Sequence, residues 1–411
     1  MERRGTTGVH AEAVAVAGGT TEFEPDVVDL LVETLWRAVK GGLPDVGTDT
    51  LLGALVMGDT DAGAAIAPGM RKAGSLSGMI SGRAGRGWVS HDEAYDAPVA
   101  ACAEADGVEV DAAWREAGWR FGLGSRGPAS QSPVLPGMTG AVRACLLLAL
   151  RSARAEGTIS VHCRHVARAL LDLPGSRARE ALLLQKLEAA AAATKLDALD
   201  ASAPARSEGP ESRGVTLLRR AGTLGKSGNR LTRALTSWTS GSSVNGSPVL
   251  FAVSVEAVRQ AVRCGRAAAE SVDLLLGILA LDRALSVAGR SLPASLAAAN
   301  AAPDLLRRHG VRQVALVSSA PAIPSSAAPD VPDGIGVRLS AAADRIMAVA
   351  RLSAAEHGSP TVGTVHLLAA LLDEPATDAD AGPGGVVVRL LAAGQVDVAA
   401  LRAELSLRLG A

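Results

Sequence analysis

One pattern occurs four times along this chain of 411 residues: two apolar stretches separated by a break that contains glycine. Apolar residues at helical spacing predict an amphipathic helix, and the glycine break predicts a turn before a second helix. The four copies occupy residues 25–76, 139–183, 254–316 and 339–405. Because a repeat of this length determines how the whole chain packs, the pattern predicts helix–turn–helix units stacked against one another.

Composition favours the same fold class. Hydrophobic residues make up 48% of the chain but aromatic residues only 2%, and alanine, leucine and valine abound. Small aliphatic side chains suit packed helices better than aromatic-rich sheets. The length exceeds one ordinary domain, and the apolar content is sufficient for more than one core. We therefore expect an all-α protein with two domains.

Charge and cysteine content limit the environment and the partners. The formal net charge is −1, so no overall positive field would attract nucleic acid or a membrane surface, and we expect neither as a partner. The four scattered cysteines suggest free thiols in a reducing compartment. The N-terminal residues are poor as a signal peptide, and no apolar run is long enough to span a membrane. The expected location is the cytoplasm.

Two segments carry a resemblance to a known family. The sequences VGTDTLLGALV (Val46–Val56) and VGTVHLLAALL (Val362–Leu372) resemble the signature around IGTEHLLLGLL in Clp N-terminal domains. Those domains consist of two such repeats related by a pseudo-twofold axis. The resemblance therefore implies two tandem Clp N-terminal-like domains, without the ATPase modules of Clp proteins, at residues 20–200 and 247–411.

The segments between the repeats differ in character. Residues 77–132 interrupt the first domain and are expected to be an insertion. Residues 201–246 are rich in Ser, Gly and Arg, and residues 318–334 are rich in Pro, Ser and Ala, so both are expected to be flexible linkers.

The resemblance also implies where a ligand would bind. In the family, a phosphoarginine pocket uses the glutamate that follows the signature threonine. Here that position holds Asp49 in the first repeat but Arg164, Val272 and Val365 in the other three, so at most one acidic partner for a guanidinium remains. The candidate ligand-binding residues are Thr48, Asp49, Thr364 and His366. From the residues alone, Gly47 and Gly363 end the approach to a helix, and the threonine after each is expected to cap that helix.

No pattern points to catalysis, a metal or a cofactor. RAGTLGKS (Arg220–Ser227) is the nearest match to a phosphate-binding loop, but its first glycine position holds Arg220, and the chemistry would require a strand, a loop and a helix in order. His162, Cys163 and His165 lack a fourth ligand, so we expect a capping turn and a half-buried histidine instead of a metal site. An enzyme is not expected.

The tryptophans stand out in an aromatic-poor chain: Trp36, Trp88, Trp114, Trp119 and Trp238. Large aromatic side chains usually serve burial, so we expect them to pack the insertion onto the first domain, although a partner-binding anchor is the alternative.

The sequence therefore predicts a non-catalytic protein that binds proteins or peptides and acts as an accessory, adaptor or decoy for a Clp protease system. Three alternatives remain: sequestration of cyclic peptide antibiotics directed at Clp, nucleotide binding at residues 220–227, and a self-associating scaffold.

Overall fold

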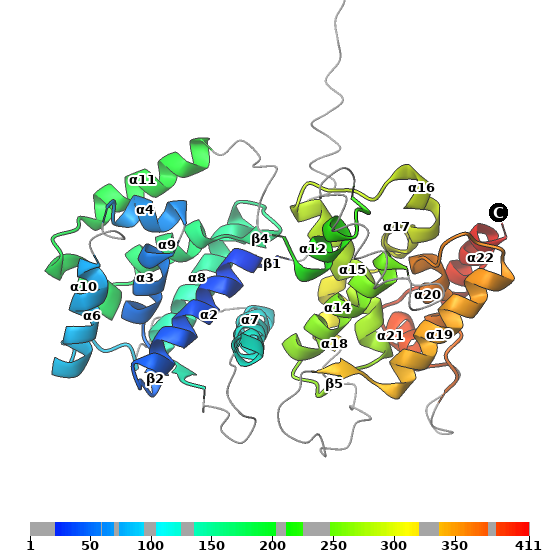
Figure 1. Ribbon diagram of the computed structural model, residues 1–411, viewed down its shortest axis with the longest axis horizontal. Helices are drawn as coiled ribbons and strands as arrows, with labels where there is room; N and C mark the ends of the chain where they lie inside the picture. Colours follow the sequence, from blue (N-terminus) through cyan, green and yellow to red (C-terminus); the bar gives the residue numbers. More distant parts are fainter. Residues whose placement is uncertain are drawn as a thin grey trace, which may run out of the picture. The chain divides into compact units, whose positions relative to one another are not determined.

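The structure is a computed structural model of the chain, and it describes residues 21–58, 60–69, 74–93, 104–124, 135–202, 211–224, 247–319, 337–376 and 384–410. The chain forms two compact units, which within the described part cover residues 21–202 and 211–410 (Figure 1). Helices dominate both units, and each described strand has only two residues. The predicted all-α class is confirmed.

The first unit is built mainly from helices. They are α2 (Pro25–Lys40), α3 (Thr48–Met57), α4 (Asp61–Ile66), α6 (Ser75–Arg86), α7 (Glu104–Gly124), α8 (Gly140–Ala155), α9 (Cys163–Asp172), α10 (Arg177–Leu184) and α11 (Ala189–Ser202). Its strands are β1 (Glu22–Phe23), β2 (Asp45–Val46), β3 (Gly137–Met138) and β4 (Ser160–Val161).

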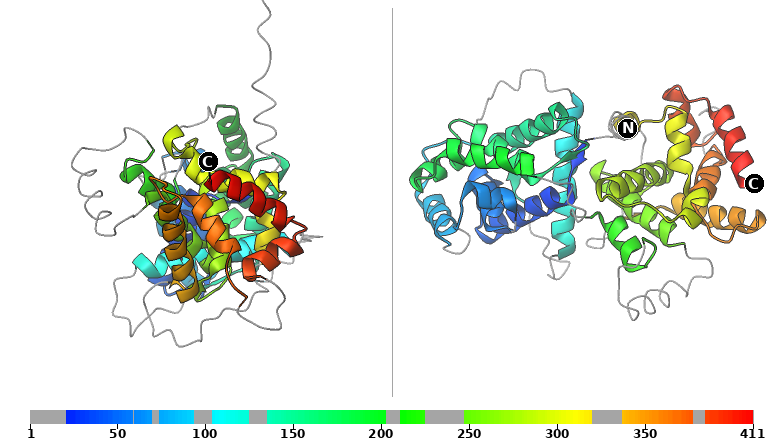
Figure 2. Two further views of the ribbon diagram at one scale, coloured as in Figure 1. Left: turned by 90° about the vertical axis from the view of Figure 1, so that its right-hand side faces the viewer. Right: turned by 90° about the horizontal axis from the view of Figure 1, so that it is seen from above.

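The second unit repeats much of this order. Its helices are α12 (Arg213–Arg220), α14 (Pro248–Arg263), α15 (Ser271–Val287), α16 (Ala294–Ala297), the 3-10 turn η2 (Ala298–Asn300), α17 (Ala302–Arg308), α18 (Gln313–Ser319), α19 (Ala341–Glu356), α20 (Thr364–Leu372), α21 (Val386–Ala393) and α22 (Val398–Leu409). Its strands are β5 (Ala268–Ala269) and β6 (Arg338–Leu339), and Figure 2 gives two further views.

All four repeats share one local plan. The first helix of each repeat, α2, α8, α14 and α19, has 16 residues. Two residues after the end of each helix stands a glycine with a left-handed backbone: Gly42, Gly157, Gly265 and Gly358 have φ between 61° and 74°. Paired backbone hydrogen bonds then close the end of each helix, as in Gly42 N–H to Val39 and Leu43 N–H to Ala38. Glycine takes this conformation without a Cβ clash, so these positions set the turns.

Short parallel strand pairs join the two repeats of the first unit. β1 pairs with β4, and β2 pairs with β3. β1 and β3 precede the first helices of the two repeats, and β4 and β2 precede the second helices. Each pair therefore joins a strand before a first helix to a strand before the second helix of the other repeat, as expected for two repeats related by a pseudo-twofold axis. In the second unit β5 pairs with β6 in the same way.

One part of the predicted linker at residues 201–246 belongs to the second unit, so that prediction is wrong for residues 211–224. Val215 and Leu218 of α12 are fully buried in the core of this unit, and the N–H of Gly214 donates to the buried Glu256 carboxylate of α14 at 3.1 Å. The short amphipathic run RGVTLLRR therefore forms a packed helix. Residues 201–202 end α11, whereas residues 203–210 and 225–246 lie outside the described residues.

The insertion at residues 77–132 contributes helices α6 and α7 to the first unit. Trp88 and Trp114 are half-buried against the core of this unit, as the burial interpretation predicts. Trp36 lies instead on α2 with 49% of its surface exposed. Trp238 lies outside the described residues, as does the predicted connector at 318–334 apart from its first two residues, which end α18. Within the part of the chain that the structure describes, no helix is long and apolar enough to cross a membrane.

Candidate functional site

The second helix of the first repeat, α3, does not begin as the sequence predicts. Its N-cap residue is Gly47, and Thr48 is already the first helical residue. Asp92, from the insertion, accepts hydrogen bonds on Oδ2 from the N–H of Thr48 at 2.6 Å and from its hydroxyl at 2.8 Å. The prediction that threonine caps this helix is therefore wrong. The Asp92 carboxylate, from a distant segment, accepts a hydrogen bond from a backbone N–H at the start of the helix, and the threonine hydroxyl is a second donor to the same carboxylate.

The same arrangement occurs at the start of the second helix of every repeat. In each case the first helical residue is small and polar, and a carboxylate or amide from a distant segment interacts with it. Asp92 and Asn300 accept hydrogen bonds from the N–H groups of Thr48 and Thr364, and Asp26 and Glu374 take the same places beside Cys163 and Ser271. The helix is α20 in the fourth repeat, where Gly363 is the N-cap residue and the capping prediction for Thr364 is wrong too. These signature residues are therefore part of the framework.

The candidate histidine, His366, also serves the start of its helix. It is 3% exposed, and its Nδ1 accepts a hydrogen bond from the N–H of Gly363 at 3.1 Å. Burial lowers the pKa of His366, and this favours the neutral imidazole that can accept the bond. Thr364 is equally buried, and its hydroxyl oxygen has no hydrogen-bond partner among the described residues.

His162, Cys163 and His165 form a capping turn, and the described residues contain no cluster that could hold a metal ion. His165 Nδ1 accepts from the N–H of His162 at 2.9 Å, and its Nε2 lies 3.1 Å from Glu156. Burial raises the pKa of the Cys163 thiol, which disfavours a thiolate ligand.

Asp49 has the least satisfied environment of the four candidates. It is 2% exposed on α3, and its Oδ1 has no hydrogen-bond partner among the described residues. Burial raises the pKa of Asp49 to about 6, against the opposing attraction of Arg177 and with added repulsion from Asp92. Gly47 makes room for this carboxylate, since a Cβ there would lie 2.3 Å from Asp49 Oδ1. A buried acid that ionises near neutral pH is typical of functional sites.

Asp49 also lines a cavity of about 370 Å³ between α2, α3 and α6. The α2 side of this cavity carries Trp36, Arg37 and Lys40, and the Lys40 ammonium lies 4.9 Å from the Trp36 ring centre. Ile80 of α6 lines it as well. An acid, two cations and an aromatic face thus border one open cavity, and a ligand here would meet both signs of charge and an apolar surface.

The equivalent place in the fourth repeat lacks this set of charges. A cavity of about 480 Å³ lies between α19, α20 and α22. Counted from the N-caps, Leu352 and Glu356 stand where the first repeat has Trp36 and Lys40, and Val365 stands in place of Asp49. Thus the structure brings together Asp49 and the cations of α2, whereas Thr364 and His366 lie in the other unit and line neither cavity.

Sequence analysis missed Arg37, Lys40, Asp92 and Arg177. The spacing of Trp36 and Lys40, four residues apart on an exposed helix face, was the available signal for the α2 side. No local signal points to Asp92, which lies 44 residues from Thr48 in the insertion.

The alternative of a nucleotide site loses its structural premise, because the VTLL run before the candidate loop belongs to helix α12 and not to a strand. Residues 225–227 of that loop lie outside the described residues. Comparison with models of known protein families, with curated proteins and with solved structures finds no match to this chain.

Proposed function

We propose that this chain is a non-catalytic protein of the Clp N-terminal type that binds proteins or peptides and serves a Clp protease system as an accessory, adaptor or decoy. Support comes from the signature-like sequences at Val46–Val56 and Val362–Leu372 and from the paired repeats that exchange equivalent strand contacts in the first unit. We place its action in the cytoplasm, in keeping with the free cysteines Cys145, Cys163 and Cys264.

The observation that carries the proposal is the Asp49 cavity. Its acid is buried, ionises near neutral pH and has an oxygen without a hydrogen bond among the described residues. Such a group costs free energy in the empty protein, and a cation that binds there offsets that cost. A guanidinium also matches carboxylate geometry better than an ammonium does.

The ligand that fits best is an extended peptide with an arginine side chain. Its guanidinium would approach Asp49, while an acidic or phosphoryl group beside it would meet Arg37 and Lys40 on the α2 side. The half-exposed Trp36 offers an apolar face for the stem of the arginine. Phosphoarginine, which carries both charges on one side chain, is therefore a ligand to test.

Fluorescence anisotropy of labelled peptides tests this site. Three peptides that differ at one position, with arginine, phosphoarginine or glutamate, should bind the full chain with different affinities. The glutamate peptide should bind most weakly. Asp49→Asn should weaken the arginine peptide by about tenfold, since charge-assisted hydrogen bonds contribute roughly 1.5–3 kcal/mol. Asp45→Asn is the matched control, because Asp45 is an exposed acid on β2 that does not line the cavity. Equal binding by both variants would exclude Asp49 as the cation partner.

The proposed role requires a second test with a reconstituted Clp ATPase and protease. An adaptor should accelerate degradation of a bound substrate, and a decoy should slow it, in both cases with loss of the effect in Asp49→Asn. Unchanged degradation at saturating amounts of this chain would contradict the Clp role while leaving peptide binding intact. Competition with a cyclic peptide antibiotic, thermal stabilisation by ATP and light scattering over a dilution series test the three alternatives.

A further inference from the structure

Three strand contacts in this molecule are equivalent, and each involves the N-cap residue of the first helix of a repeat. The N–H of Glu24 donates to Val161, that of Thr139 to Val46, and that of Ser340 to Ala269, at 2.9–3.1 Å. The residue before each of these N-caps is large and apolar: Phe23, Met138 and Leu339. Phe23 is fully buried, so this position fills space between the repeats as well as pairing the backbone.

The fourth equivalent contact would join the N–H of Ser247, the N-cap of α14, to the carbonyl of Val362. No hydrogen bond joins these two groups in the part of the chain that the structure describes. The residue at the position of Phe23 is Gly246, which has no side chain. Among the described residues, the backbone edge at Thr361–Val362 therefore lacks the contact that its counterpart in the first unit makes.

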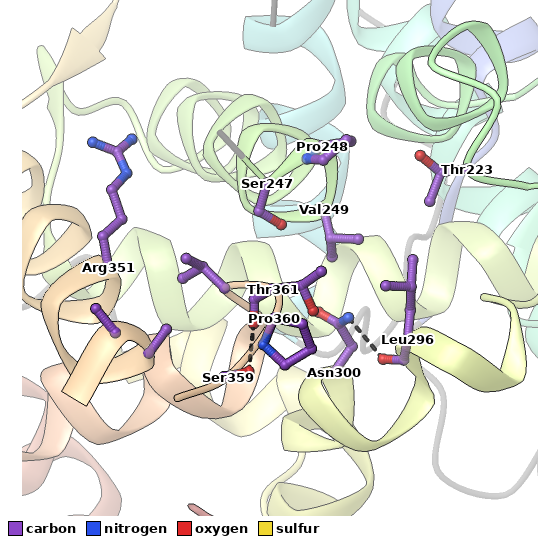
Figure 3. A pocket seen from close by; sticks show the side chains of 13 residues that line it. Thr223, Ser247, Pro248, Val249, Leu296, Asn300, Arg351, Ser359, Pro360 and Thr361 are labelled. Carbon is purple, nitrogen blue, oxygen red and sulfur yellow. Dashed lines mark hydrogen bonds between the residues drawn. The ribbon is translucent and has the colours of Figure 1, made fainter. Parts of the chain in front are cut away.

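A cavity of about 260 Å³ lies beside this edge (Figure 3). The start of α14, at Ser247 and Val249, lines one side, and the loop that contains Pro360 and Thr361 lines another. The volume is several times the roughly 30 Å³ that one water molecule occupies in the liquid. The cavity thus borders the start of α14 and the loop before α20, which correspond to the start of α2 and to β4, the strand that pairs with β1 in the first unit.

The walls suit one large apolar side chain. Val249, Ala354 and Val362 are buried and line the cavity together with the half-buried Leu296. Asn300 faces the cavity, but its amide already donates to the carbonyl of Leu296 and accepts from the N–H of Thr364, as the structure places it.

Arg351 provides the charge at this site. It lines the cavity from α19, and its side chain is exposed. In β1 the residue before Phe23 is Glu22, so an extended segment of the same type would bring an acid toward this edge. Opposite charges at the edge of an apolar pocket fix the register of a bound strand more than they add affinity.

We propose that this cavity binds an extended segment of another polypeptide, which pairs in parallel with Thr361–Val362 and inserts a large apolar side chain beside an acidic residue. Strand addition of this kind takes affinity from backbone hydrogen bonds and specificity from the pocket for one side chain. The occupant supplies the large apolar side chain that this chain lacks at the matching position, where residue 246 is glycine. The site is separate from the Asp49 cavity and does not depend on it.

The test uses a labelled synthetic peptide with the sequence of residues 18–24, GGTTEFE, and the full-length protein. Anisotropy should show saturable binding, and the same peptide with glycine for phenylalanine should bind at least about tenfold more weakly, as expected for a lost buried aromatic side chain. Ala355→Phe, at an exposed wall position, should reduce binding by a similar factor. Ala348→Phe is the matched control, since Ala348 is exposed on the same helix but does not line the cavity.

A charge exchange keeps the test valid if Ala355→Phe fails to fold. Arg351→Glu should weaken the acidic peptide, and a peptide with lysine in place of its first glutamate should recover the binding. Asp49→Asn should leave all of these affinities unchanged, which separates this site from the Asp49 cavity. Absence of saturable binding at millimolar peptide, or equal binding by Ala355→Phe and Ala348→Phe, would overturn the proposal.

Discussion

Asp49→Asn should stabilise the first unit near neutral pH, although it removes a charged residue. Burial raises the pKa of Asp49 from 3.8 to about 6. Each unit of difference corresponds to 1.36 kcal/mol, so the ionised carboxylate should cost the folded protein about 3 kcal/mol above pH 6. The sign follows from proton binding. Between pH 4 and pH 6 the folded state holds the proton more tightly than the unfolded state, so stability falls as the pH rises through this window.

Asparagine keeps the shape of the side chain but cannot ionise. The variant should therefore unfold at higher urea concentration than the wild type at pH 7.5, by up to about 3 kcal/mol, and the gain should vanish near pH 4. Tryptophan fluorescence can follow the first unit, because Trp36, Trp88, Trp114 and Trp119 all belong to it. A gain of equal size at both pH values, or a loss at pH 7.5, would refute the conclusion that Asp49 is a buried acid ionised at a cost.

Four further substitutions test the framework. Thr48→Val should destabilise by about 1–3 kcal/mol, because it removes the hydroxyl that donates to the buried Asp92 carboxylate and accepts from the N–H of Ala178. Thr364→Val loses a hydroxyl oxygen without a partner among the described residues and should be neutral or stabilising in urea unfolding. Gly363→Ala should lower the free energy of unfolding of the second unit by about 1–3 kcal/mol, and its melting temperature with it, because the new Cβ would lie 2.0 Å from a carbonyl oxygen of η2. Arg266→Met should cost about 3–5 kcal/mol in calorimetry, because it leaves Asp273 buried without its ion pair.

The repeats could be predicted from sequence because their signals are local. Apolar spacing sets the helices, and a glycine at each turn, such as Gly42 or Gly358, allows the left-handed backbone that ends the first helix. The starts of the second helices could not be predicted, since their partners come from far along the chain. Asn300, for example, caps the helix that begins at Thr364 from 64 residues away.

Helix α12 was missed for a different reason. The overall composition of residues 201–246 is dominated by serine, glycine and arginine. It conceals the eight residues of α12, whose apolar side chains share one helix face. The site shows the same division between local and distant signals. Asp49 could be identified from its place after the signature threonine, but its cavity depends on α2 and α6, which meet α3 only in the folded unit.

Hydrogen exchange measured by mass spectrometry, on the full chain with and without a saturating arginine peptide, tests the proposed function most directly. If the Asp49 cavity binds the peptide, amide protection should increase in segments that line it, residues 36–53 and 77–81, and Asp49→Asn should abolish the increase. Unchanged exchange in these segments, or the same protection in Asp49→Asn, would contradict the account.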